Sequence, residues 1–173
     1  MLRLPECRIE HLDLSFNLLH SDGINDLCKV FLKPNETMSN SLLSLELGSN
    51  NIESGGMRHL CKALMTATFC LQHLNLSQNF LHYSGCKILV DALIVNTTVR
   101  TLALASNFIK DEGAECMSFL LGLETCQLEQ LDISDNFICQ RGALAILSVF
   151  SDEGDRQLKK LDLRKNETEE LSE

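Results

Sequence analysis

Leucines alternate with polar residues in short stretches that recur along the chain. Leu12 and Leu14 alternate with His11 and Asp13, which is the pattern of a strand with one buried and one solvated side. After each such stretch the apolar residues fall at i, i+3, i+4 and i+7, which is one face of a short amphipathic helix. The helical stripes are Ile24, Leu27, Cys28 and Phe31; Met57, Leu60, Cys61 and Leu64; Cys86, Leu89, Val90 and Leu93; and Ala143, Ile146, Leu147 and Phe150. The pattern therefore predicts alternating strands and helices.

One frame, L-x-x-L-x-L-x-x-N, fits the chain six times. The frames end at Asn17, Asn50, Asn79, Asn107, Asn136 and Asn166, at spacings of 33, 29, 28, 29 and 30 residues. Glycine follows the first five of these asparagines six residues later, as Gly23, Gly56, Gly85, Gly113 and Gly142. Two residue types kept in phase over five copies indicate a repeat protein.

A strand and one helix cannot bury their own apolar faces, so such units must stack. The predicted fold is an α/β solenoid of about six repeats, a horseshoe with parallel strands on the concave face and helices on the convex face. We predict a single domain over residues 1–173, with an insertion at 32–41 and a short acidic tail at 167–173. The repeats are expected to begin near residues 9, 42, 71, 99, 128 and 158.

The recurring asparagine and glycine have structural explanations. Where the chain leaves each strand, backbone groups lose their sheet partners, and an asparagine side chain carries both the donors and the acceptor to replace them. The six frame asparagines are therefore predicted to form a structural ladder through the turns. The glycine is expected either to relieve crowding or to adopt a positive φ where the helix begins.

The motif in "LQHLNLSQNFLHYSGCKILVDAL" (71–93) resembles the leucine-rich repeat family, and within it the ribonuclease-inhibitor-like subclass. The resemblance extends over residues 7–166. It implies an intracellular horseshoe that binds proteins on its concave face. The chain departs from the family pattern where no polar capping unit precedes the first strand and where the sixth unit stops short of a helix. Uncapped ends expose apolar core, so association through the solenoid ends is a further expectation.

Composition narrows the class of partner. The 173 residues carry a formal net charge of −9, which argues against nucleic acid, because phosphate binding requires clustered lysines and arginines. No apolar run reaches the ~18 residues of a membrane span, and no secretory signal is recognised at the start. The eight cysteines are scattered without a C-x-x-C pair, so we expect reduced thiols and neither a metal nor a cofactor. The predicted location is the cytoplasm, with an organelle or cilium left open.

The outward strand residues are the candidate partner-binding surface. They are His11, Asp13, Glu46, His73, Asn75, Gln130, Asp132, Lys160 and Asp162. The residue between the last two leucines or isoleucines of each frame is acidic in four of the six units. This suits either a partner with a basic surface or a sheet face that is simply solvated.

A second candidate feature follows the frame asparagine, where phenylalanine recurs as Phe80, Phe108 and Phe137. Adjacent strands lie ~4.8 Å apart, so these rings are expected to stack as an aromatic ladder. An exposed ladder would anchor a partner, whereas a buried one would stabilise the turns. The sequence leaves both alternatives open.

No motif of an enzyme is recognisable. The chain lacks a phosphate-binding loop, a zincin motif and a nucleophile elbow, so it is expected not to be an enzyme and to have no catalytic residues. The predicted function is a protein-interaction scaffold or recognition module. The alternative is a regulator of a small GTPase, resembling the Ran GTPase-activating protein, and Arg100 and Arg164 near the strand face are the arginines that such a role would use.

Overall fold

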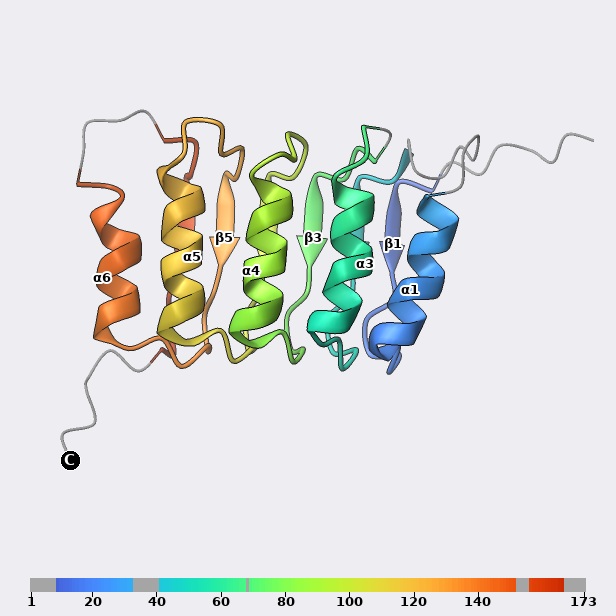
Figure 1. Cartoon of the computed structure of the whole chain (residues 1–173), viewed down its shortest axis with the longest axis horizontal. Helices are drawn as coiled ribbons and strands as arrows, with labels where there is room; N and C mark the ends of the chain where they lie inside the picture. The colour runs from blue at the N-terminus through green and yellow to red at the C-terminus, as the bar shows by residue number, and fades with distance from the viewer. Residues whose placement is uncertain (1–8, 33–40, 68, 152–155, 167–173) are drawn as a thin grey trace, which may run out of the picture.

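The structure is a computed structural model that describes residues 9–32, 41–67, 69–151 and 156–166. Strands and helices alternate along these residues in two layers, with the sheet behind a row of helices (Figure 1). The strands are β1 (His11–Asp13), β2 (Ser44–Glu46), β3 (His73–Asn75), β4 (Thr101–Ala103), β5 (Gln130–Asp132) and β6 (Lys160–Asp162). The helices are α1 (His20–Phe31), α3 (Ser54–Leu64), α4 (His82–Leu93), α5 (Lys110–Gly122) and α6 (Gln140–Ser148).

The six strands form one parallel sheet in sequence order, from β1 to β6. Equivalent residues of neighbouring units stand side by side, as Leu12 with Leu45 and Leu45 with Leu74. Each predicted repeat start lies two residues before a strand, for example residue 9 before His11. The parallel, in-register arrangement confirms the predicted leucine-rich repeat solenoid of about six units.

The core lies between the sheet and the helices. Leu45 and Leu47 of the second unit and Leu74 and Leu76 of the third point into it and are fully buried. The strands are only three residues long because after each strand the chain turns toward the next helix. The residue before every frame asparagine has a positive φ, from Phe16 in the first unit to Lys165 in the sixth.

The frame glycines allow successive helices to approach closely. A Cβ atom on Gly56 would lie 3.2 Å from Cα of Ser21 in the preceding unit, and one on Gly142 would lie 2.9 Å from Cα of Asp111. No described glycine has a positive φ. Of the two explanations offered by the sequence, crowding is therefore the correct one, and the positive φ is found instead at residues with side chains.

The last helix departs from the predicted stripe. Of the fourth stripe only Ile146 is buried, whereas Leu147 in α6 is 50% exposed and Phe150, two residues beyond the helix, is 38% exposed. The prediction of a buried stripe was wrong here, and among the described elements α5 is the helix that packs against α6. Leu144, 57% exposed, extends this apolar surface at the C-terminal end of the helix row.

Two predicted segments fall largely or wholly outside the described residues. Of the insertion at 32–41, residues 33–40 are not described, and the same holds for the tail at 167–173. In the part of the chain that the structure covers, no helix is both long enough and apolar enough to cross a membrane.

Candidate protein-interaction surface

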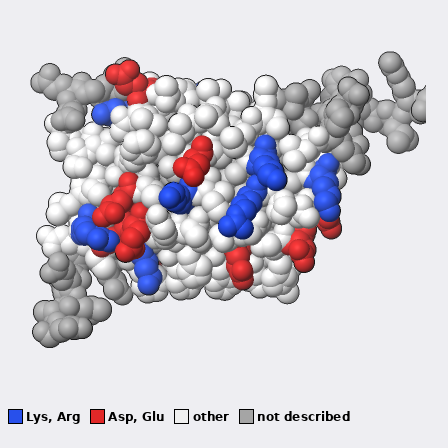
Figure 2. Space-filling view, in the orientation of Figure 1, with Lys and Arg blue, Asp and Glu red and all other residues white. Residues whose placement is uncertain are grey.

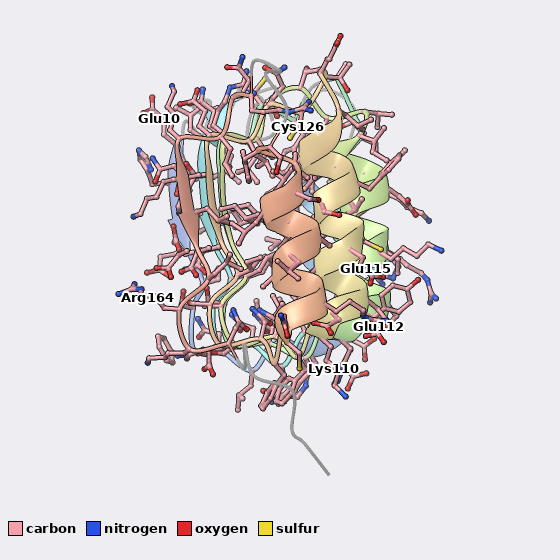
Figure 3. The ribbon with its side chains drawn as sticks, turned by 90° about the vertical axis from the view of Figure 1, so that its left-hand side faces the viewer. Glu10, Lys110, Glu112, Glu115, Cys126 and Arg164 are labelled. Carbon is pink, nitrogen blue, oxygen red and sulfur yellow. The ribbon has the colours of Figure 1, made fainter. Side chains whose placement is uncertain are left out.

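The outward side chains of the six strands form two straight columns on one surface, which we call the sheet face. The register aligns His11, Ser44, His73, Thr101, Gln130 and Lys160 in one column and Asp13, Glu46, Asn75, Ala103, Asp132 and Asp162 in the other. All nine residues proposed from the sequence for partner binding lie in these columns. The sheet face is opposite the helices, and Arg164 projects from it (Figure 3).

Most of the acidic column also has a structural role. The Oδ1 atoms of Asp13, Asn75, Asp132 and Asp162 each accept the backbone N–H two residues further on, at 2.9 to 3.0 Å. This is the local bond by which Asp and Asn favour turns. It explains why aspartate recurs at this position and why Asn75 can replace it.

The carboxylates of the column differ in their charge partners. His73 Nε2 lies 2.9 Å from Glu46 Oε1, and Arg164 Nη2 lies 2.6 Å from Asp162 Oδ2. Hydrogen bonds from the Arg164 side chain and backbone lower the pKa of Asp162 to about 2. Among the described ion pairs none involves Asp13 or Asp132, although Asp132 is close enough to Arg164 to raise the pKa of its guanidinium.

The sheet face also contains small residues, which were not among the candidate binding residues predicted from the sequence. Ala103 and Ala105 occupy the fourth unit, and Gly48 occupies the second. Small residues let a partner come close to the strand backbone. The sequence already places these small residues at outward positions of the frame. They were not chosen as candidates because they carry no charge.

A third row of charges, one residue before the strands, was also missed. Lys159 Nζ lies 2.7 Å from Glu129 Oε2, and Arg100 Nε lies 4.0 Å from Glu129 Oε1. The hydrogen bond from Lys159 lowers the pKa of Glu129. Glu10 of the same row lies at the upper edge of the sheet (Figure 3). This row is the second position of the frame, directly after its first apolar residue.

The frame asparagines line the opposite edge of the sheet in a hydrogen-bonded column. Asn79 is 1% exposed; its Nδ2 donates to the carbonyl oxygens of Leu47 and Leu76, and its Oδ1 accepts the backbone N–H groups of Asn50 and Ile52. One exception is Asn107, whose buried Oδ1 atom has no hydrogen-bond partner among the described residues. The column links each unit to the one before it.

The three phenylalanines stack along the turns next to this column. The ring centroids of Phe80 and Phe108 are 5.9 Å apart and those of Phe108 and Phe137 are 5.6 Å apart, at interplanar angles of 17° and 14°. Phe80 is 41% exposed and Phe137 is 44% exposed, while Phe108 between them is half-buried. The rings thus form a continuous aromatic edge that remains open to solvent.

The cysteines and acidic groups of the described residues do not assemble a metal site. No group of three His, Cys, Asp or Glu side chains in this part of the chain is placed to hold a metal ion. Cys28, Cys61, Cys70, Cys86, Cys116 and Cys126 are free thiols. Burial raises the pKa of the Cys28 and Cys61 thiols to about 12, which keeps both protonated and poorly nucleophilic.

Comparison with known proteins identifies relatives with the same repeat. A family model described as "Leucine Rich repeat" matches residues 39–61 and 95–118. The chain is 33% identical over 130 residues to the human protein "NACHT, LRR and PYD domains-containing protein 14" and 33% identical over 130 residues to mouse ribonuclease inhibitor. It is 34% identical over 125 residues to pig ribonuclease inhibitor.

These matches cover most of this chain but a small part of each relative. They include 75%, 75% and 72% of the chain, against 11%, 27% and 26% of the respective relatives. The similarity therefore concerns the repeat architecture described above.

Proposed function

Because the chain is a leucine-rich repeat protein of the ribonuclease-inhibitor-like subclass, we propose that it is a recognition module that binds a protein partner on its sheet face. The observation that carries the proposal is the register of the six strands, which aligns the outward residues in straight columns. Such a rigid, preorganised surface binds without the entropic cost of ordering loops.

The chemistry of the surface favours a partner with basic side chains. Asp13 and Asp132 are in none of the described ion pairs. Asp132 stands beside Ala103 in the neighbouring strand, and Asp13 lies in β1 at the end of the sheet. A projecting segment of the partner can approach the strands at Ala103 while its lysines or arginines meet the two carboxylates. Charge pairs of this kind contribute mainly to specificity and to the rate of association.

The alternative function as a GTPase regulator has less support from the geometry. An arginine that stabilises a transferring phosphoryl group must reach the nucleotide. Arg100 Nη1 donates to the carbonyl oxygen of Thr97 at 2.9 Å, and Arg164 is held by both carboxylate oxygens of Asp162. We therefore propose a non-catalytic module. A single-turnover assay with small GTPases would contradict this proposal if the chain accelerated hydrolysis.

The free thiols of Cys28, Cys61, Cys70, Cys86, Cys116 and Cys126 are consistent with a reducing compartment, and we propose that the module acts inside the cell. Within this proposal the partner would be sought in cytosolic extract.

The test compares two kinds of variant in affinity capture from that extract. Ala103→Tyr adds bulk to the centre of the sheet face without removing a hydrogen bond, and Thr125→Tyr adds the same bulk at an exposed loop. Asp13→Asn with Asp132→Asn removes two charges but keeps an oxygen for the turn bonds, as Asn75 does naturally. A direct partner should be lost with Ala103→Tyr, weakened by the asparagine variant and retained by Thr125→Tyr. Equal capture by all variants would contradict binding on the sheet face.

A further inference from the structure

The edge formed by Phe80, Phe108 and Phe137, which we call the rim ladder, is not explained by core packing. Phe108 and Phe137 have φ values of 59° and 56°, in the left-handed region that side chains other than those of Asn, Asp and Gly rarely adopt. In the second unit the same position is Asn51, with φ 55°. At the position after the frame asparagine, the second unit thus has a residue suited to a positive φ, whereas the fourth and fifth units have large, partly exposed rings.

Two features of the rim ladder carry partial positive charge. Near-parallel rings turn their faces toward one another, so ring edges are left toward solvent, and the edge is the positive part of the aromatic quadrupole. Helices α4, α5 and α6 begin two or three residues after the three phenylalanines, and the N-terminus of a helix carries partial positive charge. The rim ladder therefore favours acidic groups, although the chain has a formal net charge of −9.

A cation stands next to the rings. Lys110 begins α5, two residues after Phe108, and is exposed at the lower edge between sheet and helices (Figure 3). None of the described ion pairs includes its amino group. The ring of His82, the equivalent residue of the third unit, lies 5.4 Å from that of Phe108. Two basic side chains thus flank the rim ladder on the helix side.

The acidic groups nearby are already engaged. Asp111 accepts backbone N–H groups of α6, and the Arg141 guanidinium lies 3.3 Å from both Glu112 and Glu115. This acidic group gathers over α5 on the helix face (Figure 2). On the sheet side, Asp135 Oδ2 accepts the hydroxyl of Ser106 at 2.6 Å. Arg141 thus pairs with the carboxylates at the start of α5, whereas Lys110 and Asp135 are in none of the described ion pairs.

The same residues enclose a shallow groove. It has a volume of about 330 Å³ and is lined by Lys110, Asp111, Glu112, Phe137, Cys139 and Arg141. The groove places an apolar ring and the unpaired ammonium group on one concave surface. A side chain that enters it meets both.

We propose that the rim ladder and Lys110 form a second docking surface, distinct from the sheet face, which binds an extended segment of a partner protein with interleaved apolar and acidic side chains. The apolar side chains of the segment contact the rings, and its carboxylates pair with Lys110 and His82. The length of the ladder, three rings at 5.6–5.9 Å, suits an extended segment, whose side chains on one face repeat every ~6.6 Å. The inference does not rest on the function proposed for the sheet face.

The test uses fluorescent ten-residue peptides in two synthetic libraries. One library combines Leu and Phe with Asp and Glu in all orders, and the other replaces every acidic residue with Lys. Binding to the full chain is measured by fluorescence anisotropy. We expect binders only in the acidic library, with an affinity that falls as salt is raised.

Variants locate the surface. Phe108→Asn with Phe137→Asn removes two rings and installs the residue that the second unit already has at this φ, so the fold is expected to persist, which a melting curve checks. The double variant should weaken the best acidic peptide at least ~10-fold, as loss of a hot-spot side chain does. Lys110→Asn should weaken it by about threefold at low salt, and Ala103→Tyr on the sheet face should leave it unchanged.

Three outcomes would overturn the proposal: no binder in the acidic library, tighter binding of the lysine library, or equal binding by the double asparagine variant. A fourth would be self-association of the chain in sedimentation velocity that disappears in the same variant, because the occupant would then be a second copy. Loss of peptide binding in Ala103→Tyr alone would assign the peptide to the sheet face and likewise contradict the proposal.

Discussion

The Oδ1 atom of Asp111 accepts the backbone N–H of Gly142 from 31 residues away, at a distance of 3.1 Å. The same oxygen accepts the N–H of Cys139 at 2.7 Å, so a side chain of α5 caps the start of α6. Ser21 does the same for α3, its hydroxyl accepting the N–H of Gly56 at 3.0 Å. Each of these bonds requires neighbouring helices to touch, and glycine makes that contact possible.

Gly142→Ala should therefore destabilise the fold by about 1–3 kcal/mol, although alanine normally favours a helix. The added Cβ would lie 2.9 Å from Cα of Asp111 and 2.8 Å from Cγ2 of Ile138, so the helices must separate. Gly122→Ala is the matched control, since nothing lies within 4 Å of a Cβ there; it should be neutral or stabilise by up to about 1 kcal/mol. Urea unfolding measures both, and an unchanged midpoint for Gly142→Ala would refute the packing explanation.

The hydrogen bonds of the asparagine column predict that the same Asn→Ala substitution lowers the free energy of unfolding by different amounts in different units. Asn79→Ala removes the donor to Leu47 and Leu76 and the acceptor for Asn50 and Ile52, and should cost about 3 kcal/mol. Asn107→Ala should cost less, because the Oδ1 atom of Asn107 has no partner to lose.

Free energies of unfolding from urea denaturation compare these two variants. Asn75→Ala on the sheet face is the reference, since its side chain caps a solvent-facing turn and its loss should cost about 1 kcal/mol. Equal losses at Asn79 and Asn75 would mean that the buried column does not hold the units together.

Much of the fold could be predicted because its determinants are local. The alternation of apolar and polar residues around Leu45 and Leu47 predicts a strand within one unit. The six-residue spacing from Asn50 to Gly56 recurs in other units and marks the repeat. The spacing of the stripe that contains Leu147 matches that of the buried stripes, so spacing alone does not predict that Leu147 is 50% exposed.

The surface was predictable to a smaller extent. The strand alternation gives the columns, and the motif in which Asp or Asn precedes Ser by two residues, as in Asp132 and Ser134, could also have predicted the turn bond. The pairing of Glu46 with His73 and the exposure of Phe137 depend on the distances between units and on the φ of the turn. Neither quantity is encoded in the spacing of residue types.

The buried thiols predict a pattern of chemical modification. Burial raises the pKa of Cys28 and Cys61 to about 12, so at pH 8 both are protonated and covered by the core. Iodoacetamide should label the partly exposed Cys70 in the folded chain and leave Cys28 and Cys61 unlabelled for as long as the fold persists. Mass spectrometry of tryptic peptides measures the labelling, with the urea-unfolded chain as the control in which all three react. Rapid native labelling of Cys28 would mean that the first unit opens.

The pair formed by Asp162 and Arg164 predicts a dependence on pH. Hydrogen bonds from Arg164 lower the pKa of Asp162 from 3.8 to about 2, so the folded state favours the ionised carboxylate. The sign follows from linkage: the stabilisation is fully present above pH 3.8 and is lost as the pH falls toward 2. Carbon-detected NMR of the side-chain carboxyl should give a midpoint near 2 in the wild-type chain.

Arg164→Gln separates the charge from the turn bond. It removes the guanidinium but keeps the backbone N–H that Asp162 accepts at 3.0 Å, so the pKa of Asp162 should rise toward 3.8 without reaching it. The pKa of Asp13, which is lowered by the backbone N–H of Ser15, is the internal reference and should not move, because Asp13 lies at the other end of the sheet. An unchanged titration of Asp162 in this variant would show that the turn bond alone lowers its pKa, and the sheet face would then carry Arg164 as a free cation available to a partner.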